Sequence, residues 1–279
     1  MAVYVSTNCL ESPKDVIKVL KEYKKAGIEN VELGSVHSFF DINELRKFQF
    51  NFLMHNYFPP PKTPFNFNLA SSNNIIREKS IMLAKNAINL CNEINCPLYT
   101  FHAGFTVDPQ QLGKPFKNKN STERETAIQI FYDSISELID YAKKTDIKLA
   151  MEPNVVQEFN LVNGKNELLL FADYEEIRQL YKKISKNQLG LLLDLGHIAV
   201  TSYWLNFDKD EFVKNCANKV FAVHVSNNDG MKDQHKGLTK DCWQVSKLKL
   251  FKKNPIILET MNLDVNEIKN NIRMAQKSM

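Results

Sequence analysis

Nine side chains of the types that bind divalent metals lie at or close after the ends of short apolar runs. They are five histidines, two glutamates and two aspartates: His55, His102, Glu152, Asp194, His197, His224, Asp233, His235 and Glu259. The chain has six histidines, and only His37 lies outside this set. Imidazole and carboxylate donors without thiolate suit an ion such as Zn²⁺, Mn²⁺, Co²⁺ or Fe²⁺. The pattern therefore predicts a metal centre.

A single histidine or carboxylate in such a place is usually a solvated or hydrogen-bonded loop residue. The joint pattern favours a site, because a buried carboxylate is costly unless it is paired, protonated or bound to metal.

The segments that must position these residues alternate between short apolar runs and longer amphipathic stretches. We expect strands at Val3–Ser6, Val31–Gly34, Phe50–His55, Pro97–His102, Ile147–Glu152, Leu189–Asp194, Val220–Val225 and Pro255–Glu259. We expect helices at Ser12–Ala26, with Pro13 in the first turn, and at Asn73–Asn92, Ser121–Lys144, Asp173–Ile184, Asp208–Cys216 and Asp264–Lys277. Runs that are apolar throughout are typical of strands buried on both faces. The alternation predicts a parallel sheet, and eight units in about 250 residues fit one closed (β/α)8 TIM barrel, a single domain over residues 1–279.

In such a barrel the carboxyl ends of the strands converge on one rim, where active sites lie. The longest expected loops, at Asn56–Ser72, Thr106–Asn120 and Ser226–Lys240, would surround that rim. Aromatic residues on the rim loops could exclude water, although ordinary loop packing is the commoner role for any single one of them: Phe39, Phe40, Tyr57, Phe58, Phe65, Phe67 and Trp204.

Composition narrows the class of protein. The chain has 279 residues, of which 43% are hydrophobic and 24% charged, and this composition excludes a disordered or fibrous protein. Its formal net charge of +4 indicates no strong preference for nucleic acid. Five scattered cysteines without a CxxC motif suit a reducing compartment, and Cys91, Cys96 and Cys216 are expected in the core. The chain shows no signal peptide and no apolar run of about 18 residues, so we expect a cytoplasmic protein without a membrane partner.

Several motifs resemble the xylose-isomerase-like TIM-barrel superfamily, which includes endonuclease IV-like enzymes and sugar or sugar-phosphate isomerases and epimerases. The resemblance covers nearly the whole chain. It rests on VELG at 31–34, HNYFPP from 55, NLASSNNIIREKSI from 68, FHAGF from 101, MEPN from 151, LLDLGH from 192, HVSNNDGMKDQH from 224 and LET from 258.

The resemblance implies two alternative ligand sets. Endonuclease IV-like enzymes bind three zinc ions, which implies His55 and His102 at one metal, bridged by Glu152 to a second that Asp194, His224 and Glu259 complete. His197, Asp233 and His235 would then hold the third. The isomerases and epimerases use one metal, which implies the ligands Glu152, Asp194, His224 and Glu259.

Two departures separate this chain from the endonuclease IV pattern. The Gly-acid-Gly turn that usually follows the DxH motif is replaced by HKGLTKDCW from His235. The Asn-Thr-Ala-Gly that usually follows the glutamate is here PNVV, at 153–156. The basic segment containing Lys114, Lys117, Lys119 and Arg124 adds little support for DNA, since a run of charges is usually a solvated surface.

We therefore expect a metal-dependent isomerase or epimerase of a small sugar or sugar phosphate, with one Zn²⁺, Mn²⁺ or Co²⁺. Glu152 and Glu259 would transfer the proton, and the metal would hold two adjacent substrate oxygens. His55, His102 and His197 would then bind substrate. The alternative is a phosphodiesterase of endonuclease IV type, acting on abasic DNA with up to three Zn²⁺, and it would use all nine ligands. A non-catalytic binding barrel is a third, weaker reading. The substrate, the metal count and the oligomeric state stay open.

Overall fold

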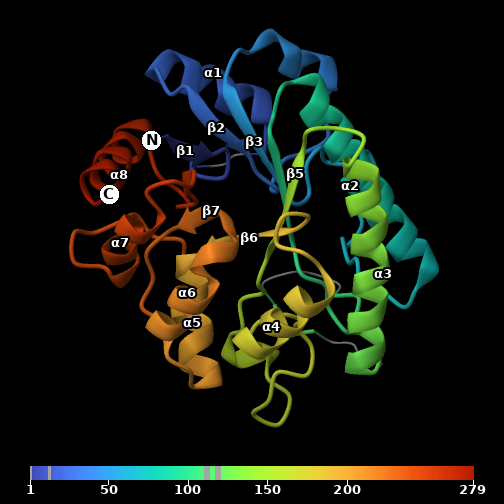
Figure 1. Cartoon of the computed structure of the whole chain (residues 1–279). Coiled ribbons are helices and arrows are strands. Elements are labelled where there is room, and N and C mark those ends of the chain that lie inside the picture. Colours follow the sequence, from blue (N-terminus) through green and yellow to red (C-terminus); the bar gives the residue numbers. More distant parts are fainter. Residues whose placement is uncertain (1, 12–13, 110–113, 117–120) are drawn as a thin grey trace.

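The structure, a computed structural model, describes residues 2–11, 14–109, 114–116 and 121–279. Eight strands pair in parallel in chain order, and the first closes the barrel against the last (Figure 1). The strands are β1 (Val3–Ser6), β2 (Asn30–Leu33), β3 (Asn51–His55), β4 (Leu98–His102), β5 (Lys148–Glu152), β6 (Gly190–Asp194), β7 (Val220–Val225) and β8 (Ile256–Leu258). The predicted (β/α)8 barrel is confirmed.

Helices surround the barrel on its outside (Figure 1). They are α1 (Val16–Ala26), α2 (Asn74–Glu93), α3 (Arg124–Ala142), α4 (Tyr174–Lys183), α5 (Leu195–Leu205), α6 (Lys209–Cys216), α7 (Trp243–Lys247) and α8 (Val265–Lys277). Short 3₁₀ helices lie at η1 (Ile42–Lys47), η2 (Glu158–Asn160), η3 (Ala217–Lys219) and η4 (Leu248–Phe251). A search of the described residues finds no helix with the length and apolarity to span a bilayer.

Aspartates set where several helices begin. The side chains of Asp173, Asp208 and Asp264 each accept hydrogen bonds from backbone N–H groups of the first helical turn. Asp15 does the same for α1, while Ser12 and Pro13, expected to open that helix, lie outside the described residues.

Helix α5 was not predicted. All of its first eight residues are buried, so it shows no polar stripe of the kind that marks a surface helix.

The main core lies between the strands and the helices, and Cys91, Cys96 and Cys216 are buried in it as predicted. A second, smaller cluster fills the barrel interior and consists of Leu53, Leu98, Ala150, Leu192, Ala222 and Ile257. Because side chains alternate along a strand, the residue two positions further on also faces the interior. In β5, β6 and β7 that residue is Glu152, Asp194 or His224. The apolar cluster thus lies deeper in the barrel than these polar residues.

Shortening one side chain of this apolar interior cluster should destabilise the barrel strongly. We expect Leu192→Ala to lower the free energy of unfolding by about 3 kcal/mol, because Leu192 is fully buried and the closed barrel cannot collapse onto the cavity. Urea unfolding of the metal-free protein measures the change. Leu250→Ala is the matched control, since Leu250 is 54% exposed and should change stability little. If Leu192→Ala lowered the free energy of unfolding by less than about 1 kcal/mol, tight packing of the apolar interior cluster would be contradicted.

Candidate metal centre

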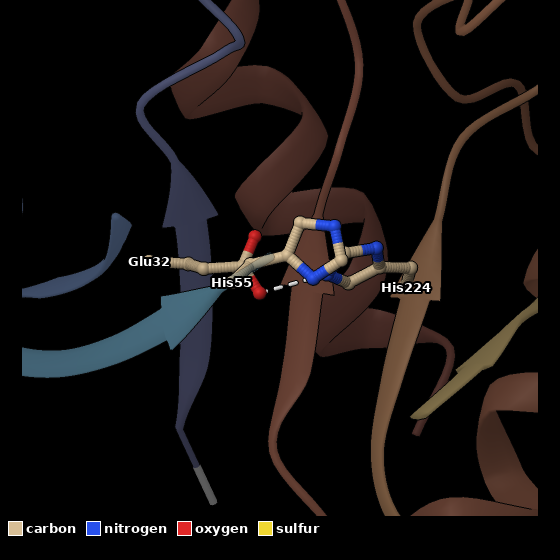
Figure 2. Close-up of side chains that lie close together, drawn as sticks. All are labelled: Glu32, His55 and His224. Atoms are coloured by element: carbon tan, nitrogen blue, oxygen red, sulfur yellow. Dashed lines mark hydrogen bonds and ion pairs between the residues drawn. The ribbon is translucent and has the colours of Figure 1, made fainter. Parts of the chain in front are cut away.

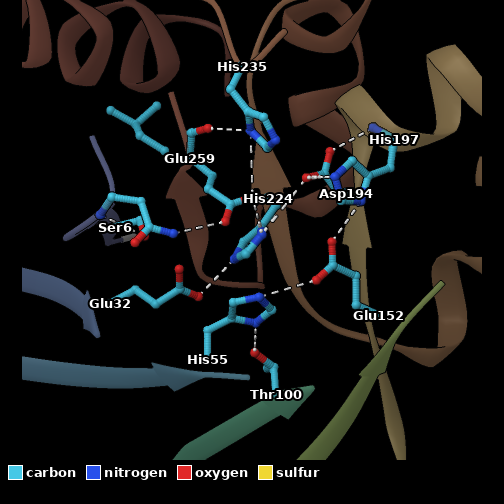
Figure 3. Close-up of polar contacts among 12 residues, drawn as sticks. Ser6, Glu32, His55, Thr100, Glu152, Asp194, His197, His224, His235 and Glu259 are labelled. Carbon is cyan, nitrogen blue, oxygen red and sulfur yellow. Dashed lines mark hydrogen bonds and ion pairs between the residues drawn. The ribbon is translucent and has the colours of Figure 1, made fainter. Parts of the chain in front are cut away.

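The structure brings all nine candidate ligands together at the carboxyl end of the barrel (Figure 3 shows seven of them labelled). Strand register contributes directly: His102 is the cross-strand partner of Glu152, and Asp194 is that of His224. Three groups of donor atoms result, and within each group the atoms lie within 4.8 Å of one another.

The first group is His55, His102 and Glu152. The Oε2 atom of Glu152 lies 3.5 Å from Nε2 of His55 and 3.4 Å from Nδ1 of His102. The ring of His55 is held from its other side by the Thr100 hydroxyl, 2.8 Å from Nδ1. That hydroxyl donates to the carbonyl of Met54, so it accepts from Nδ1–H and leaves Nε2 of His55 unprotonated, facing Glu152.

The second group is Glu152, Asp194 and His224, with Glu259 beside it. Nδ1 of His224 lies 3.0 Å from Oε2 of Glu259 and 3.9 Å from Oδ2 of Asp194. Asp194 is also the N-cap of α5, and its Oδ1 accepts a 2.9 Å hydrogen bond from the backbone N–H of His197. The helix start thus fixes one oxygen of Asp194 and leaves the other facing the site.

The third group is His197, Asp233 and His235. Oδ2 of Asp233 lies 3.4 Å from Nε2 of His197 and 3.1 Å from Nε2 of His235. Asp233 and His235 come from the loop after β7, which a bridge between Asn227 and Lys236 folds back on itself. Nδ1 of His235 lies 2.8 Å from the Glu259 carbonyl, to which it donates a hydrogen bond.

The donor set fits divalent metal ions. Three buried carboxylate oxygens in the three groups have no hydrogen-bond partner among the described residues: Oε2 of Glu152, Oδ2 of Asp194 and Oδ1 of Asp233. Oε1 of Glu152 and Nδ1 of His197 lie 2.9 Å apart, and Nδ1 of His224 lies 3.0 Å from Oε2 of Glu259, but neither pair has the geometry of a hydrogen bond. Buried polar atoms of this kind are costly unless something satisfies them. A cation among them would do so, and oxygen and imidazole nitrogen are the donors that zinc and manganese accept.

Charges in the metal-free site are balanced between carboxylates and imidazoles. Burial alone would raise the pKa of Glu152, but His102 and His197 outweigh it and lower that pKa to about 2. Burial lowers the pKa of His235, yet Asp233 reverses this and raises it to about 10. Burial is dominant for His55, whose pKa falls to about 3, so this ring is neutral and ready to bind a cation. Burial also dominates for Asp194, whose pKa it raises above the usual value.

Sequence reasoning missed Glu32, a fully buried residue of β2 whose Oε1 lies 2.8 Å from Nε2 of His224. The signal was present, because Glu32 is a carboxylate inside the apolar run between Val31 and Leu33. It was overlooked because it lies one residue before the strand end.

A pocket of about 200 Å³ opens above the ligands. Its floor includes His55, His102, His197, Asp233, His235 and Glu259. Its walls are mainly apolar: Val36, Phe105, Phe116, Val155, Phe159, Leu169 and Met261. The seven aromatic residues expected to wall this rim do not line it, and that expectation was wrong. Two of them, Phe58 and Phe67, are buried in the core instead.

The aromatic walls come from two segments: Phe105 and Phe116 lie between β4 and α3, and Phe159 lies in the long loop between β5 and α4. The second was not recognised as a long loop from the sequence. Of the basic segment, Lys117 and Lys119 lie outside the described residues, and Arg124 is paired with Glu176.

The family model described as the xylose isomerase-like TIM barrel matches residues 20–278, so this chain belongs to that family of enzymes. Among curated proteins, the chain is 27% identical over 228 residues to "Apurinic-apyrimidinic endonuclease 1" of Plasmodium berghei, covering 74% of this chain and 40% of that protein. The chain therefore spans about two fifths of the length of that relative.

Solved structures of two activities share the fold. A "D-tagatose 3-epimerase-like protein" superposes with a TM-score of 0.71 at 19% identity, covering 100% of this chain and 97% of the other. An "AP endonuclease, family 2" from Brucella melitensis gives a TM-score of 0.64 at 13% identity, covering 96% of each chain. At these identities the likeness shows the fold, and the reaction must be argued from the site.

Proposed function

We propose that this protein is a metal-dependent isomerase or epimerase of a small sugar. The observation that carries the proposal is the pocket: it is small, and seven apolar side chains line it together with the candidate ligands. Its other polar lining residues are uncharged: Asn8, Ser35, Asn154, Gln157 and Asn160. None of the described residues lining it is Lys or Arg, whereas a DNA-binding surface neutralises several phosphates with such residues. The pocket therefore suits a compact, polyhydroxylated molecule.

Glu152, Asp194, His224 and Glu259 would hold one divalent ion, as argued from their donor atoms. When bound, such an ion polarises substrate oxygens and so acidifies the neighbouring C–H bond. Glu259 lines the pocket and would accept or return the proton at its carboxylate. Glu152 is fully buried and contacts His102 and His197, which line the pocket, and it would serve as the second proton-transfer group. Its pKa below the ordinary range keeps it ionised at neutral pH.

The remaining floor residues would orient the substrate. His102 and His197 line the pocket and have ring nitrogens that can hydrogen-bond to hydroxyls. The apolar walls would exclude bulk water from the reacting carbon. Asn8, which also lines the pocket, donates to Oε1 of Glu259 at 3.5 Å and helps to aim that carboxylate.

A second candidate is a multinuclear phosphodiesterase acting on abasic DNA. It is favoured by the position of Glu152, whose Oε2 faces the first group and whose Oε1 lies 2.9 Å from Nδ1 of His197. A carboxylate placed between ligand groups suits a bridge between two ions. The names of the curated relatives support the same reading.

One variant separates the two candidates. Under the isomerase proposal, His102→Ala should leave one metal equivalent bound and weaken substrate binding, since His102 would then bind the substrate and would not be a metal ligand. Under the phosphodiesterase alternative, the same change should remove one metal and abolish cleavage. Elemental analysis of metal content, solvent-deuterium exchange into a panel of ketoses and aldoses, and cleavage of an abasic-site duplex provide the three readouts.

His37→Ala is the control, because His37 is a buried histidine that bonds Thr7 and belongs to none of the ligand groups. Its metal content should equal that of the parent. Efficient duplex cleavage by the parent, without exchange of any sugar C–H proton, would overturn the isomerase proposal.

A further inference from the structure

The candidate ligands His55, His224 and His235 share a feature on the side facing away from the proposed ions. One ring nitrogen of each is held by an acceptor: the Thr100 hydroxyl, the Glu32 carboxylate and the Glu259 carbonyl, respectively. Two of these acceptors are neutral. Only the acceptor of His224 is a side-chain carboxylate. Its residue, Glu32, lies on β2, a strand that supplies none of the nine candidate ligands.

Glu32 and His224 face each other across the barrel interior, while His55 lies next to them (Figure 2). Both Glu32 and His224 are completely buried, and the rings of His55 and His224 meet edge to face with centroids 5.0 Å apart. The position of the His224 ring is thereby fixed from two sides. With Nε2 directed at Glu32, the other nitrogen, Nδ1, is directed at Glu259 and Asp194.

We infer that Glu32 is a positioning residue for the metal: it binds Nε2–H of His224 and so presents the Nδ1 lone pair to the ion. The inference rests on the proposed metal site but not on which reaction the site catalyses. The carboxylate does two things at once. It selects the tautomer with the proton on Nε2, and its negative charge makes the ring a stronger donor.

Glu32, His55 and His224 also have donor atoms close enough to form a group of their own. A separate ion there would compete with contacts already made. Nε2 of His224 is occupied by Glu32, and Nδ1 of His55 by Thr100. The orienting role uses the same contacts without breaking any of them.

The test compares the affinity of the metal-free proteins for Zn²⁺ and Co²⁺, measured by competition with a chromophoric chelator. We expect Glu32→Gln to weaken binding at the His224 site by roughly 10- to 100-fold. The amide can accept from Nε2 or donate to it, so it no longer forces Nδ1 to be free. Glu32→Leu, which removes the acceptor, should weaken binding at least as much. Visible absorption of bound Co²⁺ should change in both variants.

Glu29→Gln is the matched control, because Glu29 is exposed and lies just before the same strand, so the charge change is identical. Its metal affinity should equal that of the parent. A purely structural role for Glu32 would lower the melting temperature of the metal-free protein without changing affinity. Equal affinity of Glu32→Gln and the parent would therefore overturn the inference.

Should neither Glu32 variant fold, the parent protein itself decides. With ¹⁵N-labelled histidine, NMR spectra should show His224 protonated at Nε2, and addition of Zn²⁺ should shift its Nδ1 resonance. Coordination through Nε2 would contradict the inference. A parent that binds neither ion would overturn both this inference and the proposed metal site, whereas a parent that binds metal but moves no sugar proton overturns only the proposed reaction.

Discussion

Glu152→Gln should reduce turnover on the order of 10³-fold, the largest loss expected of any conservative change in the site. Glu152 is fully buried, and its two oxygens face histidines of different ligand groups. The amide keeps the shape of the side chain but loses its negative charge and its capacity to take up a proton. Metal binding should therefore be weaker and proton transfer slower. Proton exchange between sugar and deuterated solvent, followed by NMR, measures turnover, and elemental analysis measures bound metal.

Glu158→Gln provides the control for Glu152→Gln. Glu158 is exposed on η2, six residues further along the chain, so the same chemical change there should leave both readouts at parental values. Near-normal turnover by Glu152→Gln would contradict its assigned role in either candidate reaction, because both reactions require the charge of Glu152.

Loading the metal-free protein with Zn²⁺ should raise its melting temperature by about 10 °C at an ion concentration 1,000 times the dissociation constant. Binding to the native state alone contributes about 4 kcal/mol under that condition, and each kcal/mol shifts the midpoint by roughly 2–4 °C in a chain of this size. The physical reason is that the ion satisfies carboxylate and imidazole atoms that otherwise lack partners. Thermal unfolding with and without a chelator provides the measurement.

The stabilisation of the protein by bound metal should increase as pH rises. In the metal-free protein, burial lowers the pKa of His224, but Glu32 and Glu259 reverse this and raise it well above the usual value of 6.5. The stability from these ion pairs is therefore fully present below pH 6.5 and is lost as pH rises through the raised pKa. An ion needs the neutral ring, so its binding displaces that proton and strengthens with pH. Calorimetry in two buffers of different ionisation enthalpy should detect proton release. Binding that is independent of pH between 6 and 8 would show that the imidazoles are not displaced in this way.

The arrangement of the ligands was predictable to the extent that it follows from strand ends. Each of Glu152, Asp194 and His224 lies two residues beyond an apolar interior position, and strand alternation dictates that all of them face inward. Because the barrel closes, inward-facing residues at the same end must meet. The grouping of the ligands into three sets depends on register and side-chain rotamers, which one sequence does not specify.

Two differences between the structure and the predictions from sequence have physical explanations. The first eight residues of helix α5 are buried whatever their type, so the periodicity that reveals surface helices is absent from it. The pocket walls were assigned to the wrong aromatic residues because aromatic rings serve the core as well as a rim. Phe58 is completely buried, while Phe159, on a loop that the sequence did not mark as functional, faces the pocket.

The candidate ligands and the pocket walls have different sources in the chain. Five of the nine candidate ligands lie in strands, whereas the apolar walls come from segments between strands and helices. Changes at wall residues such as Phe105, Phe116 and Phe159 can therefore alter which molecule fits without changing Asp194 and His224, which would hold the proposed ion. Substrate range and metal chemistry can accordingly evolve at separate rates on one scaffold. Under the proposed function, Phe105, Phe116 and Phe159 are the positions to change for a new sugar substrate, with the strands left as they are.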